Sequence, residues 1–338
     1  MSYNLKPVRD SQLDILKGIG ILFVVYAHIC ISSSSAFLYL FHMPLFFFLS
    51  GAALSFASNL NFSFKKRFRR IMVPYFIFSV LSFIYWCFFE LKFRSVHNIK
   101  ILPGILSSID WRIQQFLNIF IAFSQKDAFL YNVVLWFLPC LFVSMLVYIV
   151  IQKTLGRHMV WGIGGLAMIP FVFPHIMLPW CSELALIALP FIYMGRYLYF
   201  KVKALNIVVG GGIFLLLGYV IIYFINPHVD MRIHETGDWW SFYSIAFAFI
   251  FALCIFSKLL VGKDKVFEWL GRNSLTIMCI HEPLKRIILV VVSRISGLEI
   301  SIIRSSVLMS LLCTCFLIML LFPLVKGINK YVPIAVGK

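Results

Sequence analysis

Ten apolar runs follow one another along the chain, each close to the roughly 20 residues that a membrane-spanning helix needs. Serine and proline residues mark several of the breaks between them. The pattern predicts helices at 15–34, 36–57, 71–90, 130–152, 159–176, 181–200, 204–226, 240–260, 267–292 and 305–327. Another helix, lying at the membrane surface, is predicted near 111–125. We therefore expect an all-α, polytopic membrane protein with about 10 transmembrane helices, formed by a single domain over residues 1–338.

The composition agrees with this pattern. Apolar residues make up 62% of the 338 residues and charged residues only 13%, whereas a soluble domain is about half apolar and about a quarter charged. The composition thus excludes an ordinary soluble protein and a disordered chain. The eight cysteines are scattered through apolar segments. They form no spacing typical of a metal site or of a disulfide framework, so we expect no metal.

Charge predicts the orientation of the helices. The net charge is +17, and most basic residues stand beside apolar runs, which favours basic cytoplasmic loops over a nucleic-acid-binding surface. With the N-terminus inside, 20 of the 30 basic residues fall in cytoplasmic segments, and 9 of the 13 acidic residues fall outside. This asymmetry predicts that both termini of the multi-pass protein are cytoplasmic.

Three ionisable residues line one side of the first predicted helix: Asp14, Lys17 and His28. Lys17 and His28 are 11 residues apart, which is three turns and about 20°, and about 16 Å along the axis. Lys17 is therefore expected at the cytoplasmic rim and His28 well inside the membrane. A group that ionises there is costly unless it is paired, and is a functional candidate by default. The alternative is a histidine that hydrogen-bonds a neighbouring helix, and the spacing leaves both open.

A basic stretch, Lys65-Lys66-Arg67-Phe68-Arg69-Arg70, directly precedes the third apolar run. Charge alone favours an anchor that contacts anionic membrane lipid. The other interpretation is a clamp for phosphate groups, for which the planar fork of arginine is well suited. Arg67 and Arg70 are the candidates for that clamp.

Other candidate residues lie in or beside later apolar runs, and each alone fits a residue at the membrane interface. The loop 227–240 adds polar residues beside Trp239 and Trp240, which suits a carbohydrate surface or, with a slight preference, the membrane interface. The candidates in the apolar runs are His42, Trp136, Glu183 and His281.

Taken together, these stretches resemble the membrane-bound acyltransferase family 3, and most closely its branch of fucose 4-O-acetylases and polysaccharide O-acetyltransferases. The resemblance runs in order from residue 9 to 283. This chain has Lys17 where an arginine is common, so the charge is kept and the planar fork is lost. The matching pieces are Asp14-x2-Lys17-Gly18, Lys17-x10-His28, Phe41-His42-Met43-Pro44 with Ser50-Gly51, Arg67-x2-Arg70 with Pro74-Tyr75, Trp136-Phe137-Leu138, and Leu270-Gly271-x-Asn273-Ser274 with His281-x-Pro283.

The resemblance implies transfer of an acetyl group from cytoplasmic acetyl-CoA to a hydroxyl of an extracytoplasmic or lipid-linked glycan. It implies that His28 is the general base or relays the acyl group, with Lys17 and Asp14 tuning its charge, and that Arg67 and Arg70 bind the acetyl-CoA phosphates. His42, Trp136, His281 and Glu183 are weaker candidates for contacting the acceptor. A transporter or flippase for a lipid-linked glycan is the alternative, since many spans and buried charges fit that class too.

Overall fold

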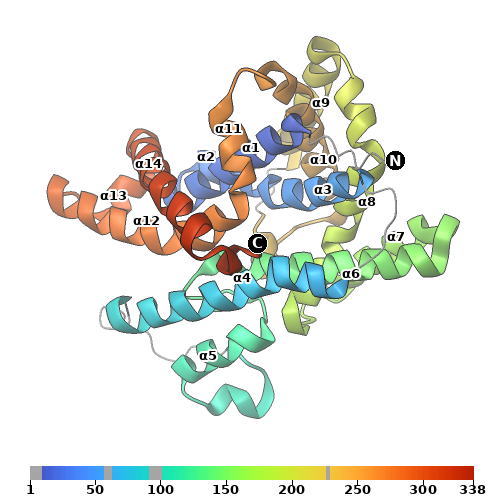
Figure 1. The fold of residues 1–338 in the computed structure, drawn as a ribbon. Helices are drawn as coiled ribbons and strands as arrows, with labels where there is room; N and C mark the ends of the chain where they lie inside the picture. Colours follow the sequence, from blue (N-terminus) through green and yellow to red (C-terminus); the bar gives the residue numbers. More distant parts are fainter. Residues whose placement is uncertain (1–9, 57–62, 91–100, 226–228) are drawn as a thin grey trace, which may run out of the picture.

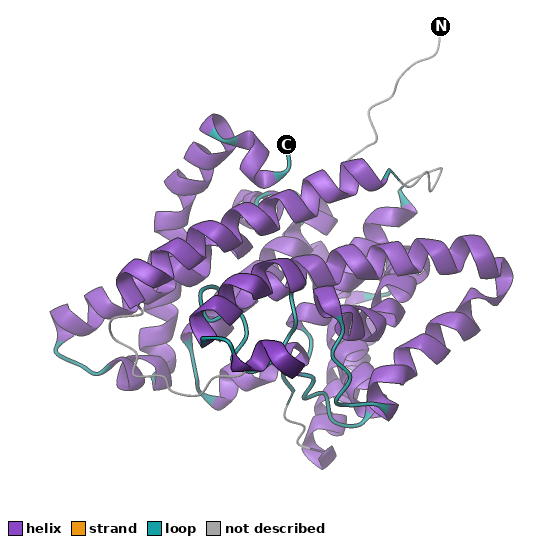
Figure 2. Cartoon of the chain, turned by 90° about the horizontal axis from the view of Figure 1, so that it is seen from below, coloured by secondary structure: helices purple, strands orange, loops and turns teal. Residues whose placement is uncertain are grey.

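The computed structural model describes residues 10–56, 63–90, 101–225 and 229–338. Throughout these residues the chain forms helices joined by loops and no strand (Figure 2). The α-helices are α1 (Ser11–Ile29), α2 (Ser33–Tyr39), α3 (His42–Ser55), α4 (Phe64–Tyr85), α5 (Trp111–Ile121), α6 (Phe137–Leu155), α7 (Met159–Val172), α8 (Ser182–Ala204), α9 (Gly212–Ile225), α10 (Trp239–Phe256), α11 (Lys265–Arg272), α12 (Ser274–Ser296), α13 (Ile300–Ser305) and α14 (Val307–Tyr331).

The all-α fold class is confirmed. Seven helical segments of the described residues are long and apolar enough to cross a membrane. One of them, Val133–Val172, contains both α6 and α7. α12 has the length of a span but carries Glu282, Lys285 and Arg286 in its middle. The number ten therefore stays a prediction, as does the orientation. The additional helix expected near 111–125 is present as α5.

Two predicted helices are each divided in two, and the sequence explains both breaks. The run at 36–57 becomes α2 and α3, because Pro44 lacks the N–H that would bond the carbonyl of Leu40. The run at 267–292 becomes α11 and α12. Here the side-chain amide of Asn273 donates to the carbonyl oxygen of Trp269 at 2.8 Å, and the backbone N–H of Asn273 reaches the same oxygen at 3.2 Å, so Asn273 caps the end of α11.

Glycines bring two pairs of helices into backbone contact. A Cβ at Gly18 would collide with the carbonyl oxygen of Phe267, and a Cβ at Gly271 with that of Asp14. α1 and α11 therefore pack along each other. The same relation joins α3 and α8 through Gly51 and Gly195. In Figure 1, α1 and α3 lie between α12–α14 on one side and α7–α9 on the other.

The outer surface is rich in apolar side chains. α14 shows this most clearly, because only 28% of its most apolar window is buried within the molecule. Leu308 and Met319 on this helix and Val208 before α9 are among the large apolar side chains that are mostly exposed. A soluble protein seldom exposes so continuous an apolar surface, and lipid is the solvent that suits it.

Candidate functional site

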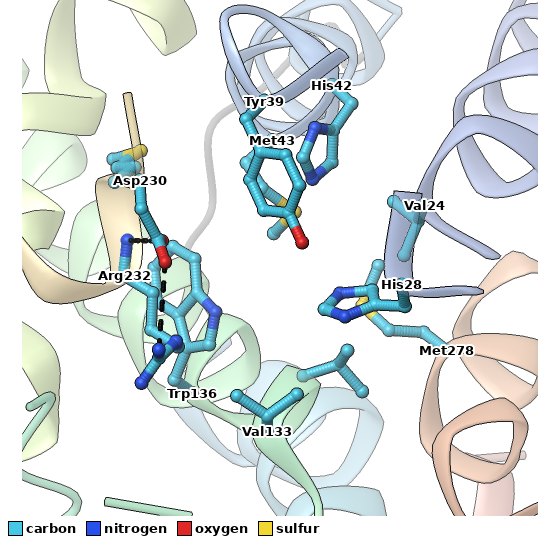
Figure 3. A pocket seen from close by; sticks show the side chains of 12 residues that line it. Val24, His28, Tyr39, His42, Met43, Val133, Trp136, Asp230, Arg232 and Met278 are labelled. Carbon is cyan, nitrogen blue, oxygen red and sulfur yellow. Dashed lines mark hydrogen bonds and ion pairs between the residues drawn. The ribbon is translucent and has the colours of Figure 1, made fainter. Parts of the chain in front are cut away.

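A small cavity of about 120 Å³ lies where α1, α2, α3 and α12 meet two short 3-10 helices, η4 (Val133–Trp136) and η8 (Met231–Ile233) (Figure 3). We call it the histidine cavity. Three of the candidates from the sequence, His28, His42 and Trp136, line it together. Its remaining lining residues are Val24, Tyr39, Met43, Val133, Val134, Asp230, Met231, Arg232 and Met278.

Local structure directs the aromatic and histidine side chains into this cavity. His28 lies in the last turn of α1, Tyr39 ends α2 and His42 begins α3. Because the break between α2 and α3 spans only two residues, Tyr39 and His42 stay side by side, with ring centroids 4.9 Å apart. The Nδ1 of His42 is 2.6 Å from the carbonyl oxygen of Leu38. The Tyr39 hydroxyl points towards His28 in Figure 3, and its 3.5 Å bond to the carbonyl oxygen of Ala27 is long and weak.

A buried charge cluster supports His28 from α12. The Nδ1 of His28 is 3.9 Å from a carboxylate oxygen of Glu282. The same carboxylate accepts hydrogen bonds from the Lys285 ammonium at 2.7 and 2.8 Å and from the Arg286 guanidinium at 3.3 Å. Glu282 and Lys285 are 2% and 8% exposed. Charges at this depth persist because they are paired, since an unpaired one would cost several kcal/mol.

His281 on α12 is in ring contact with His28. Their ring centroids are 5.6 Å apart. Within the described part of the chain, its Nδ1 is 3.0 Å from the carbonyl oxygen of Ile277, while its Nε2 is buried and has no hydrogen-bond partner. His281 is therefore placed to fix the position of the His28 ring. Contact of His281 with an acceptor stays a prediction.

Lys17 lines a second cavity of about 280 Å³, the lysine cavity, together with Phe46, Ser50, Phe137 and Arg272 among others. The histidine cavity and the lysine cavity share one lining residue, Met278. Asp14 does not lie with His28. It is buried at the crossing of α1 and α11, with Oδ2 3.4 Å from the Arg272 guanidinium. This arrangement suggests that Asp14 contributes to packing and charge balance rather than to the reacting group.

The basic stretch forms the first turns of α4 and one wall of a groove of about 400 Å³, the basic groove, which holds Arg70. Arg67 lies on the same helix and is half-buried. The guanidinium of Arg69 donates to the carbonyl oxygen of Lys338 at 3.1 Å. The other lining residues are Ser63, Lys65, Lys66 and Gly337.

Glu183 lies apart from the histidine cavity, in the first turn of α8. Its carboxylate accepts a hydrogen bond from the backbone N–H of Leu178 at 3.0 Å and is buried. This bond closes the turn before α8, a structural role. Contact of Glu183 with an acceptor stays a prediction.

Sequence reasoning did not select several residues that the structure brings to the site. Glu282, Lys285 and Arg286 carry a readable signal, because opposite charges three and four residues apart within an apolar run face each other on a helix. Asp230 and Arg232 were considered only as part of a polar loop. Their ion pair, with nitrogen and oxygen 3.6 Å apart, borders the histidine cavity. Tyr39 gave no signal of its own.

Comparison with protein families decides the class of this protein. A family model described as an acyltransferase domain matches residues 10–328, which is nearly the whole chain. The chain belongs to acyltransferase family 3. Searches of curated proteins and of solved structures gave no match. The acyltransferase therefore has its histidine cavity and its lysine cavity entirely within the matched region. Membership favours an acyltransferase over the flippase alternative.

No group of three or more His, Cys, Asp or Glu residues that could hold a metal ion occurs in the part of the acyltransferase that the structure describes. The groups at or beside the histidine cavity that can exchange a proton or carry charge include the imidazole of His28, the hydroxyl of Tyr39 and the charged side chains of α12.

Proposed function

We propose that this acyltransferase moves an acetyl group from cytoplasmic acetyl-CoA to a hydroxyl of an extracytoplasmic or lipid-linked glycan, in a bacterial inner membrane. The observation that carries the proposal is the histidine cavity. An imidazole that can accept a proton lies there, beside a second cavity lined by a cation. Acyl transfer from a thioester to a hydroxyl needs a general base at the hydroxyl and a cationic site for the phosphates of the donor.

The donor would approach from the side of Lys17. The phosphates of acetyl-CoA carry several negative charges, and the basic groove at the start of α4 gathers lysine and arginine side chains that suit them. The pantetheine arm would then pass through the lysine cavity towards Met278, the residue it shares with the histidine cavity. The acetyl thioester would end beside His28.

His28 would act as the general base. Glu282 faces its Nδ1, so the Nδ1 proton stays and Nε2 is the nitrogen that accepts a proton. As Nε2 takes the proton of the acceptor hydroxyl, that oxygen bonds to the acetyl carbonyl carbon. The carbon–sulfur bond then breaks, and the CoA sulfur leaves with the proton that the imidazolium returns. The Tyr39 hydroxyl, which points towards His28 (Figure 3), would donate a hydrogen bond to the acetyl carbonyl oxygen, which becomes negative in the tetrahedral intermediate.

The acceptor would bind on the side of η8 and Trp136. Asp230 accepts and Arg232 donates hydrogen bonds, and sugar hydroxyls can do both. The Trp136 ring offers an apolar face for a sugar ring. Arg232 is held in place by donating to the carbonyl oxygen of Gln125 at 2.8 Å, so the loop presents its guanidinium in a defined position.

The proposal is tested with purified protein in nanodiscs, radiolabelled acetyl-CoA and a pool of bacterial surface glycans. We expect label on glycan and release of CoA with the native chain, and a loss of turnover of about 10²–10⁴-fold in His28→Ala, the usual contribution of a general base. His158→Ala, which changes an exposed histidine after α6, is the matched control and should stay within twofold. Near-normal turnover in a folded His28→Ala protein would remove His28 from this role. If no CoA is released with native membranes supplying acceptor, the acetyl transfer itself is refuted.

A further inference from the structure

The histidine cavity and the lysine cavity lie at successive levels of the same helices. In the part of the chain that the structure describes, α1, α3, α12 and the continuous segment η4–α6 each contribute side chains to both cavities. On α1, Lys17 in the lysine cavity precedes His28 in the histidine cavity. On α3 the order is reversed, because Met43 in the histidine cavity precedes Ser50 in the lysine cavity. The segment η4–α6 follows the order of α3, and α12 that of α1, so the two cavities lie end to end within the helices.

Met278 occupies the boundary between the two cavities. It lines both of them and is only 2% exposed. Ser274, one turn earlier on α12, lines the lysine cavity, and Glu282, one turn later, faces His28. Both are about 6 Å from Met278 along the helix axis. In Figure 3 the Met278 side chain extends from α12 towards the His28 ring. A group that moves from the lysine cavity to His28 therefore has to pass this side chain.

The neighbouring aromatic side chains are held more firmly than Met278. Phe46 and Phe137 line the lysine cavity with their ring centroids 5.9 Å apart. Phe137 also packs against the ring of Phe47, at 5.0 Å, and all three rings are buried. Close packing leaves such rings little room to move, whereas methionine is unbranched and adapts its shape to its surroundings. Met278 is therefore the side chain best able to turn aside when a thioester passes.

The histidine cavity has room for a short acyl group. Its volume of about 120 Å³ corresponds to roughly four groups the size of a water molecule, at about 30 Å³ each. An acetyl group brings three non-hydrogen atoms, and the acceptor hydroxyl is a fourth. Val24, Val134 and Met278 give the cavity an apolar wall, which suits the methyl of an acetyl group. Further carbons would have to occupy space that Met278 fills.

We propose that Met278 sets the length of the acyl group that this acyltransferase accepts, and restricts the donor to acyl groups of about two to three carbons. This rests on the proposed function and names the class of its donor. Substitution of Met278 by alanine removes three non-hydrogen atoms, Cγ, Sδ and Cε, from the wall beside His28. The space left there should admit acyl groups about three carbons longer, such as a hexanoyl group.

The test measures how acyl length changes the binding of acyl-CoA to the protein in nanodiscs, without acceptor. The probes are acetyl-CoA, butyryl-CoA and hexanoyl-CoA, and empty nanodiscs correct for their partition into lipid. Each methylene that finds room in an apolar cavity should tighten binding about fourfold. We expect the native chain to bind hexanoyl-CoA no more tightly than acetyl-CoA. Met278→Ala should shift the ratio of the two dissociation constants by about tenfold or more in favour of hexanoyl-CoA. The matched control is Met72→Ala, which shortens a buried methionine of α4 that lines neither cavity and should leave the ratio unchanged.

Two further variants keep the test decisive if Met278→Ala does not fold. Met278→Val shortens the side chain less and should shift the ratio a few-fold in the same direction, with Met72→Val as its control. Met278→Leu nearly conserves the volume of the side chain and should keep the native ratio. An unchanged ratio in Met278→Ala, or an equal shift in Met72→Ala, would overturn the proposal. So would a native chain that binds hexanoyl-CoA about tenfold more tightly than acetyl-CoA, since its cavity would then set no limit.

Transfer of the same acyl groups to glycan separates this proposal from the proposed function. If the native chain acetylates glycan but Met278→Ala keeps the native ratio of dissociation constants, the role of Met278 is wrong and the acetyl transfer stands. If Met278→Ala shifts the ratio and no acyl group reaches any glycan, the role of Met278 in donor binding stands and the acetyl transfer is wrong.

Discussion

Two groups of charged residues in this molecule are held in opposite ways. In the α12 cluster, Glu282 and Lys285 are almost fully buried and each has a partner at 2.7–2.8 Å. At the start of α4, Lys65, Lys66, Arg69 and Arg70 are exposed and border an open groove. A buried charge is tolerated only with its partner, whereas the interactions of an exposed charge weaken as the salt concentration rises. We therefore expect the cations of the α12 cluster to act on folding and the cations at the start of α4 to act on binding.

Removing the anion of the buried cluster should have the largest effect. Glu282→Ala leaves Lys285 buried without its carboxylate, so we expect the free energy of unfolding to fall by about 3–5 kcal/mol and turnover to be lost. Thermal unfolding of the purified protein in detergent measures this. Adding Lys285→Met should recover much of the stability but not the activity. A loss below about 1 kcal/mol would show that water solvates Lys285 or that an anionic lipid pairs with it in the variant.

Lys17 lies between the two extremes, because it is half-buried and lines the lysine cavity. Lys17→Met should raise KM for acetyl-CoA by about tenfold or more, the effect of losing a charge-assisted bond to a phosphate or to the thioester. Lys17→Arg keeps the charge and should stay within a few-fold of the native KM. Steady-state kinetics with a saturating acceptor give both values. An unchanged KM for Lys17→Met would place the donor elsewhere.

Substitutions of the exposed basic residues at the start of α4 should have weaker effects, and only on substrate binding. Arg70→Gln is expected to raise KM for acetyl-CoA a few-fold at low ionic strength, and the difference should disappear at about 1 M salt, where charges are screened within about 3 Å. The free energy of unfolding should change by less than about 0.5 kcal/mol. Lys153→Gln, an exposed lysine at the end of α6, is the control. A salt-independent effect would argue against a phosphate contact.

The smallest effect is expected for Arg69→Gln. This side chain is exposed and donates to the carbonyl oxygen of Lys338, so its loss should change stability by less than about 0.5 kcal/mol. Its effect on KM should be smaller than that of Arg70→Gln. Chemical unfolding and kinetics on the same preparations compare the two. If Arg69→Gln destabilised the protein as Glu282→Ala does, the distinction between the two groups would fail.

Much of the fold follows from local sequence. Apolar runs of span length predicted the helices, since length and composition alone decide that feature. The divisions at Leu40–Phe41 and at Asn273 were not predicted, because they depend on one missing N–H and on one side chain that caps the preceding helix. Such signals are single residues inside long apolar runs, and a count of hydrophobic residues does not register them.

The site was predictable only in part, for a different reason. The Lys17 and His28 spacing lies within one helix, so its geometry can be derived from the sequence. The partners of His28 come from α12, and Asp230 and Arg232 come from a loop before α10. Whether these residues lie near His28 depends on how helices far apart in the sequence pack together, which no local pattern specifies. For the same reason the sequence aligned Asp14 with Lys17 and His28 on one side of the helix but gave no indication of its partner Arg272.

The close contact of α1 and α11 at their glycines sets the level at which His28 and His281 meet. Gly18 and Gly271 mark one level of contact, and His28 and His281, each ten residues later, meet again in ring contact. Adding or deleting one residue in either ten-residue segment would turn one histidine by about 100° and shift it by about 1.5 Å. Natural and engineered variants should therefore tolerate no change in the length of these segments.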